Sequence, residues 1–111
     1  MSEHRYVFIE TRDPFQGSGD GFVAETATTL RRRGRAVAVF LVQNGVLAAR
    51  AGARGSTLGA LAAAGVDVLA DDFSLRERGI DARDLTSGVR ESSIGTLVDL
   101  IVQPNTKAVW H

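Results

Sequence analysis

Two adjacent carboxylates, Asp71 and Asp72, follow the strand-like segment Val66 to Ala70. Paired carboxylates can perform acid/base chemistry when their surroundings separate their pKa values, and they can also bind a hard cation such as magnesium. No other Asp, Glu or His stands at a convincing ligand spacing, so no metal site and no cofactor are predicted. The structural alternative is that one carboxylate caps a short helix that follows while the other is solvated.

Arg78 and Gly79 lie at the end of the same segment. An arginine in a pocket could bind a small anionic ligand such as sulfate, phosphate or a carboxylate. Alternatively, Arg78 could pair with Asp71, with Asp72 or with a partner subunit. Gly79 is expected to adopt a backbone conformation that other residues resist.

Ser74 also belongs to this segment, but the sequence offers it no evident base. His4 and His111 stand near the two ends of the chain, and nothing in the sequence brings either one close to Ser74. A Ser-His-Asp triad is therefore not supported. Phe73 and Trp110 are interpreted as packing residues of the core or of an interface.

The elements that must position these residues alternate between short apolar runs and helical patterns. Strands are predicted at 6–9, 36–42, 66–70 and 107–110, and helices at 21–33, 46–51, 57–64 and 94–102. Thr57 and either Ser92 or Ser93 are expected to cap two of the helices. Residues 81–91 are expected to form a polar connection. This alternation predicts one domain, residues 1–111, with an α/β fold: three layers, α/β/α, around a mostly parallel sheet of about five strands.

Ligands of an open parallel sheet bind outside the carboxyl ends of its strands. Three loops, 11–21, 43–45 and 71–79, are expected to meet at that edge. Within the first loop, the glycine spacing of residues 17–21 matches neither a dinucleotide fingerprint nor a P-loop, so a loop with a helix start is the favoured interpretation. The candidate ligand-binding residues at this edge are Thr11, Asn44, Gly45, Asp71, Asp72, Arg78 and Gly79.

The composition limits the classes of function. The chain of 111 residues carries 13 basic and 13 acidic side chains, a balance that argues against a nucleic-acid or anionic-membrane partner. No stretch approaches the roughly 20 apolar residues of a membrane span, and the first residues do not resemble a signal peptide. A cytoplasmic protein is therefore expected. The absence of cysteine excludes disulfides and thiolate metal sites.

Several short pieces of sequence carry a resemblance when they are taken in order. They are Val39 to Val46, Arg78-Gly79-Ile80, Gly88-Val89 and Ile94 to Leu100. Their order and spacing resemble those of DsrE-like (DsrEFH-like) sulfur-relay proteins. In that family a cysteine commonly leaves the strand eight residues before the glycine, and some members have a second cysteine three residues later. The corresponding residues here are Asp71 and Ser74.

The resemblance implies an oligomer, because relatives assemble as trimers or hexamers, sometimes from unlike subunits. It does not imply the family's sulfur chemistry, because a thiolate is the group that attacks and carries sulfane sulfur. We therefore expect a non-catalytic member, either a subunit in a homo-oligomer or with a DsrE-like partner, or a small-ligand-binding domain. The alternative is an enzyme that uses Asp71 or Asp72 for acid/base or metal-assisted chemistry on a small molecule.

Overall fold

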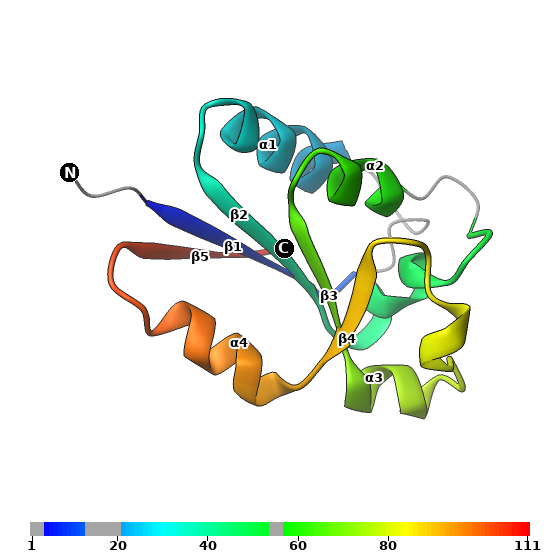
Figure 1. The fold of residues 1–111 in the computed structure, drawn as a ribbon. Helices are drawn as coiled ribbons and strands as arrows, with labels where there is room; N and C mark the ends of the chain where they lie inside the picture. The colour runs from blue at the N-terminus through cyan, green and yellow to red at the C-terminus, as the bar shows by residue number, and fades with distance from the viewer. Residues whose placement is uncertain (1–3, 13–20, 54–56) are drawn as a thin grey trace.

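The computed structural model describes residues 4–12, 21–53 and 57–111. Within these ranges the chain forms one five-stranded sheet in the order β4-β3-β2-β1-β5, and every neighbouring pair of strands is parallel (Figure 1). The predicted mostly parallel sheet of about five strands is therefore confirmed. The strands are β1 (Arg5–Glu10), β2 (Ala36–Leu41), β3 (Asp67–Asp71), β4 (Val89–Ser92) and β5 (Thr106–Trp110).

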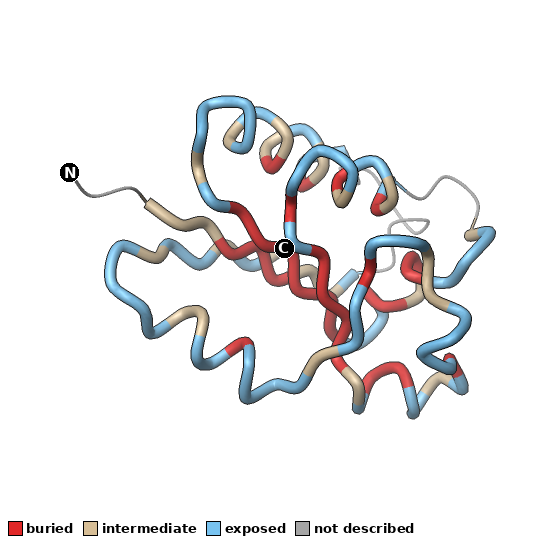
Figure 2. The backbone as a smooth tube through the Cα atoms, viewed as in Figure 1, coloured by how far each residue is buried: buried red, intermediate tan, exposed pale blue. Residues whose placement is uncertain are grey.

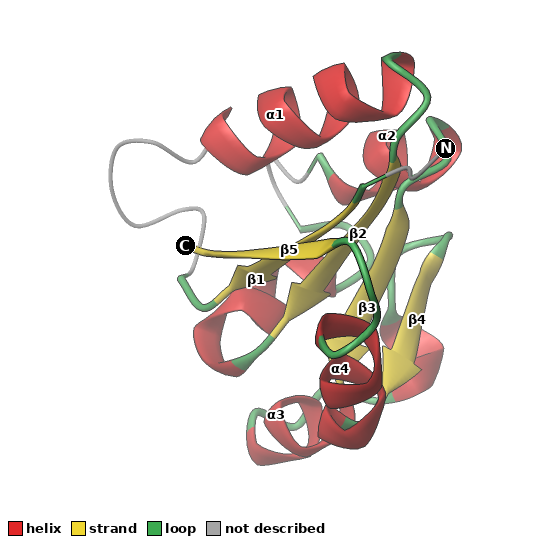
Figure 3. Cartoon of the chain, turned by 90° about the vertical axis from the view of Figure 1, so that its left-hand side faces the viewer, coloured by secondary structure: helices red, strands yellow, loops and turns green. Residues whose placement is uncertain are grey.

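Helices cover both faces of the sheet (Figure 3). They are the α-helices α1 (Gly21–Arg32), α2 (Leu58–Ala63), α3 (Asp72–Glu77) and α4 (Ile94–Ile101), with two 3-10 helices, η1 (Gln43–Ala49) and η2 (Ala82–Asp84). Helices α1 and α2 lie on one side of the sheet and α4 lies on the other, as the three-layer prediction requires (Figure 1). Helix α3 continues directly from the end of β3.

The strands alternate their apolar side chains between two cores. Phe8, Val39 and Val68 pack with α1 and α2, whereas Ile9 and Phe40 belong to the core beneath α4. Buried residues therefore run along the middle of the sheet (Figure 2). These strands are continuous apolar runs because both of their faces are covered.

Three local predictions need correction. The expected helix at 46–51 is a 3-10 helix that begins earlier, at Gln43. Thr57 precedes α2, but its side chain makes no capping hydrogen bond. The expected polar connection contains strand β4, whose Arg90 and Glu91 are exposed at the edge of the sheet. An edge strand with charged side chains has no apolar run by which the sequence could reveal it.

Helix α4 begins at a serine cap. The Ser93 hydroxyl accepts a hydrogen bond from the backbone N–H of Thr96 at 3.3 Å, which selects Ser93 over Ser92 as the capping residue. The Ser93→Ala variant should lose about 1 kcal/mol of unfolding free energy, the usual contribution of a serine cap. Urea denaturation measures this loss. Ser92→Ala is the matched control and should change stability by less than about 0.5 kcal/mol; equal losses in the two variants would contradict the assignment.

Candidate functional site

A cleft of about 730 Å³ lies at the carboxyl edge of the sheet. Residues at or just beyond the ends of all five strands contribute to it. The lining residues are Thr11, Val42, Gln43, Asn44, Asp71, Asp72, Phe73, Ser74, Glu77, Arg78, Ser93, Ile94, Leu97 and Trp110. The structure therefore brings together Thr11, Asn44, Asp71, Asp72 and Arg78 from the predicted set. Residues 13–20 of the first predicted loop, including most of the glycine-rich 17–21, lie outside the described residues.

Asp71 is the last residue of β3 and the cap of α3. Its Oδ2 atom accepts hydrogen bonds from the Ser74 backbone N–H at 3.0 Å and from the Ser74 hydroxyl at 2.7 Å. The structural alternative for the two carboxylates, in which one of them caps the following helix, is thus confirmed for Asp71. Asp72 lies in the first turn of α3, partly exposed, with its Oδ2 atom 3.9 Å from Arg76 Nη1.

The other oxygen of Asp71 is in a different situation. Only 5% of the Asp71 surface is exposed, and Oδ1 is buried without a hydrogen-bond partner among the described residues. Buried polar atoms in folded proteins are nearly always paired, because an unpaired one costs free energy. Oδ1 is therefore an acceptor with unused capacity at a residue that lines the cleft.

Ser74 joins α3 to η1. The Ser74 hydroxyl donates to Asp71 and accepts a hydrogen bond from the Gln43 backbone N–H at 2.8 Å. The Gln43 backbone has φ of 52°, a conformation that is uncommon for a residue other than glycine. Gln43 belongs to the loop 43–45 that was expected at this edge, but it was not among the candidate ligand-binding residues, because no sequence signal marks a glutamine for this conformation.

Within the described residues Arg78 does not pair with Asp71 or Asp72, so two of the three partners considered for it from the sequence are wrong. Its Nε and Nη2 atoms donate to Asn44 Oδ1 at 3.2 and 3.0 Å, and Nη1 donates to the Ser74 carbonyl oxygen at 3.2 Å. All three nitrogens thus contact neutral oxygen atoms. The guanidinium group holds the loop after β2 against α3.

Gly45 and Gly79 do not line the cleft, although both were candidate ligand-binding residues. Gly45 is buried, and a Cβ atom at this position would lie 2.2 Å from the Glu10 carbonyl oxygen. Gly79 has φ of 67°, so the expectation of an unusual backbone conformation there is confirmed. Gly45 allows η1 to approach the end of β1 closely, and Gly79 allows the turn after α3.

Apolar side chains form one side of the cleft. Phe73, Ile94 and Trp110 line it while remaining 58%, 55% and 67% exposed. The expectation that Phe73 or Trp110 packs in the core of this chain is therefore wrong. Leu97 of α4 adds a buried apolar surface to the same side.

In the part of the chain that the structure describes, the geometry supports neither His111 as a base for Ser74 nor a metal site. His111 Nδ1 lies 2.9 Å from Glu10 Oε2, and the imidazole ring stacks on Phe22, so this histidine is not the base of Ser74. Across the described residues there is no group of three or more His, Cys, Asp or Glu side chains that could hold a metal ion. None of the helices in the described ranges has the length and apolarity needed to cross a membrane.

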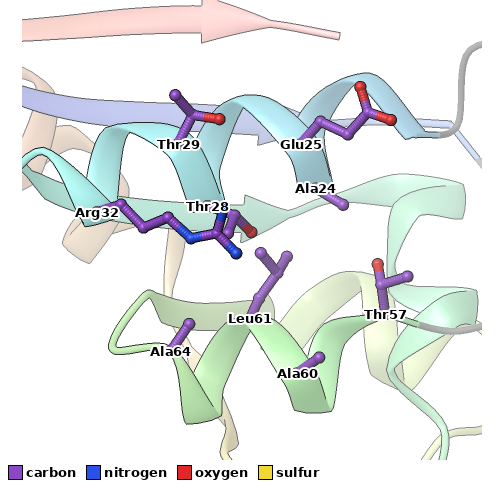
Figure 4. A pocket seen from close by; sticks show the side chains of 9 residues that line it. All are labelled: Ala24, Glu25, Thr28, Thr29, Arg32, Thr57, Ala60, Leu61 and Ala64. Carbon is purple, nitrogen blue, oxygen red and sulfur yellow. The ribbon is translucent and has the colours of Figure 1, made fainter.

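A second hollow, of about 660 Å³, lies between α1 and α2 (Figure 4). Small side chains dominate it, with Thr28 and Arg32 on α1 facing Leu61 and Ala64 on α2. Among the described residues, none of the buried polar atoms without a partner belongs to this hollow. The cleft at the sheet edge is therefore the better candidate site.

Comparisons with known protein families and solved structures agree with the observed fold. The sequence model of the DsrE/DsrF-like family matches residues 4–106. The chain belongs to the DsrE/DsrF-like family. A comparison with curated proteins found no match.

Solved structures share this DsrE/DsrF-like fold. The ychN protein from E. coli is 18% identical, with a TM-score of 0.83 over 97% of this chain and 99% of its own. A protein of unknown function, MTH1491 from Methanobacterium thermoautotrophicum, is 22% identical, with a TM-score of 0.73 over 98% of this chain and 100% of its own. At these identities the likeness establishes the fold alone.

Proposed function

We propose that this DsrE/DsrF-like protein binds a small ligand in the cleft at the sheet edge, acts as a homo-oligomer and carries no sulfur on its own chain. One observation carries the proposal: Asp71 and Ser74, which stand where the resemblance places the family's cysteines, form a closed hydrogen-bonded pair beside an open cleft. A carboxylate cannot form a persulfide. A role linked to intracellular sulfur relay, in the cytoplasm, is part of the same proposal.

Exposed apolar side chains along α4 support the proposal that the protein is an oligomer. Ile94, Val98 and Val102 follow one another at four-residue spacing along α4 and its end, and all three are exposed. Side chains four residues apart lie on the same face of a helix. This exposed apolar stripe on α4 is expected of a subunit whose contacts are completed by another chain.

Native mass spectrometry of the protein purified from its own source tests the assembly. We expect a homotrimer or homohexamer at micromolar concentration, without added sulfur after incubation with a sulfane-sulfur donor. A monomer would contradict the oligomer, and a stable gain of one sulfur atom per chain would contradict the loss of sulfur carriage. A complex with a cysteine-bearing DsrE-like subunit would replace the homo-oligomer with a mixed assembly.

Ligand binding has a separate test. An NMR screen of a broad fragment library against the isotope-labelled protein should shift the backbone amides of Gln43, Ser74 and Arg78. A library that leaves all three amides unperturbed, while the assembly is intact, would overturn the binding proposal.

A second function is favoured by the unpaired oxygen of Asp71. A buried carboxylate with a free acceptor can serve as a general acid or base toward a substrate in the cleft. The distinguishing result is a defined activity that is lost in Asp71→Asn while the circular dichroism spectrum and the assembly stay unchanged. Asp72→Asn is the matched control, because Asp72 lines the same cleft and is partly exposed.

A further inference from the structure

We infer that the ligand of the sheet-edge cleft is an organic amine, bound through its ammonium group to Asp71 and through its apolar part to the exposed rim. This inference rests on the proposed function, since it names the ligand class of the same cleft. Three features of the described residues carry it: an unpaired buried oxygen, the balance of charge and an aromatic rim.

The unpaired Oδ1 atom of Asp71 can accept a hydrogen bond from a ligand. Oδ1 of Asp71 is a buried carboxylate oxygen with no donor in the described chain, while Oδ2 already accepts two hydrogen bonds from Ser74. An ammonium group has three N–H donors and the opposite charge, so it can satisfy Oδ1 through a charge-assisted hydrogen bond. A carboxylate or phosphate has no donor to offer when it is ionised and would add repulsion.

The charged side chains that line the cleft are mostly negative, which also favours a cationic ligand. Asp71, Asp72 and Glu77 contribute three carboxylates, against the single guanidinium of Arg78 among the described lining residues. Arg78 already directs its three nitrogens to oxygens of Asn44 and Ser74. The cleft therefore favours a cation over the small anion that Arg78 suggested in the sequence.

The rim selects an organic cation over a metal ion. Phe73 and Trp110 expose their rings at the cleft, and aromatic faces attract ammonium groups and bury apolar carbon. A divalent metal would need more oxygen ligands than the cleft gathers, since no group of three potential ligands exists in the described ranges. An amine with an aromatic or alkyl body matches both parts of the cleft.

Three probes of similar size separate charge from shape. Phenethylamine is cationic at neutral pH, phenethyl alcohol is neutral and hydrocinnamate is anionic. NMR titration of the full-length, isotope-labelled protein should show phenethylamine shifting the amides of Gln43 and Ser74. We expect phenethylamine to bind about tenfold or more tightly than the alcohol, as one charge-assisted hydrogen bond allows, and hydrocinnamate to leave these amides unshifted.

Variants then assign the contacts. Asp71→Asn should weaken phenethylamine binding about tenfold through the lost charge. Because Asp71 also caps α3, Trp110→Ala on the exposed rim provides an independent test and should weaken binding about threefold or more. Asp99→Asn changes an exposed residue outside the cleft and should leave the affinity unchanged.

The outcomes separate this inference from the proposed function. Equal or tighter binding of hydrocinnamate in the cleft would overturn the amine and leave ligand binding in place. Failure of all three probes to shift the cleft amides would also overturn the amine, whereas ligand binding itself fails only if the broad fragment library fails too. Unchanged phenethylamine affinity in both Asp71→Asn and Trp110→Ala would overturn the assigned contacts.

Discussion

Replacing Gly45 with alanine should destabilise the folded protein by about 3 kcal/mol, at the upper end of the usual cost of overpacking a core. The added Cβ atom would lie 2.2 Å from the Glu10 carbonyl oxygen and 3.0 Å from the Glu10 carbonyl carbon. These are backbone atoms at the end of β1, and the same oxygen accepts a hydrogen bond from the Val42 N–H at 3.0 Å. Because the clashing atoms belong to the backbone, moving a flexible side chain cannot relieve the clash. The backbone itself cannot move easily, because β1 is paired with a strand on both sides.

Urea denaturation followed by circular dichroism measures this loss, and Gly59→Ala is its matched control. Gly59 lies in α2, and its added Cβ atom would be 3.5 Å from a methyl group of Thr86, an ordinary contact. Glycine is a poor helix former, so Gly59→Ala should gain about 0.5–1 kcal/mol. Similar stabilities for the two variants would contradict the close approach at Gly45.

Replacing Asp71 with alanine should remove about 2–4 kcal/mol of stability. The change deletes the cap of α3, which is worth about 1 kcal/mol. It also leaves the buried backbone N–H and hydroxyl of Ser74 without the partner they now share, and unpaired buried groups cost about 1–3 kcal/mol. The loss falls on the junction between β3 and α3, directly beneath the cleft.

Thermal and urea unfolding of Asp71→Ala and Asp71→Asn give the comparison. Asparagine keeps the volume and one acceptor oxygen for Ser74, so Asp71→Asn should lose only about 1 kcal/mol or less. A stability of Asp71→Ala equal to that of the unchanged protein would show that the Asp71–Ser74 pair adds nothing to the fold. An equal large loss in both variants would instead assign the stability to the charge of Asp71.

The sequence was most informative where burial dictates residue type. Strands β1, β2 and β3 are covered on both faces, so their continuous apolar runs made them visible. Strand β4 was hidden because its exposed Arg90 and Glu91 carry no apolar pattern. Helix α3 was partly visible, since a carboxylate at the end of a strand is a familiar helix cap and Asp71 has that role.

The site was less predictable than the fold. The rule that ligands meet the carboxyl edge of a parallel sheet brought Thr11, Asn44 and Arg78 into one set, and the structure places all three at the cleft. Their partners were not predictable, because Arg78 contacts Asn44 across 34 residues of sequence and no charge pattern marks that contact. The position of Gly45 behind the cleft also depends on a tertiary contact, with Glu10.

The strand order has a consequence for synthesis of the chain. Strand β1 lies between β2 and β5, and its Arg5 pairs with Thr106 almost a full chain length away. Until β5 has emerged from the ribosome, the apolar strand β1 is an unprotected sheet edge, the kind of edge that recruits other chains into aggregates. Truncation before residue 106 should therefore yield insoluble protein, because it would make permanent an edge that normal synthesis leaves open only briefly.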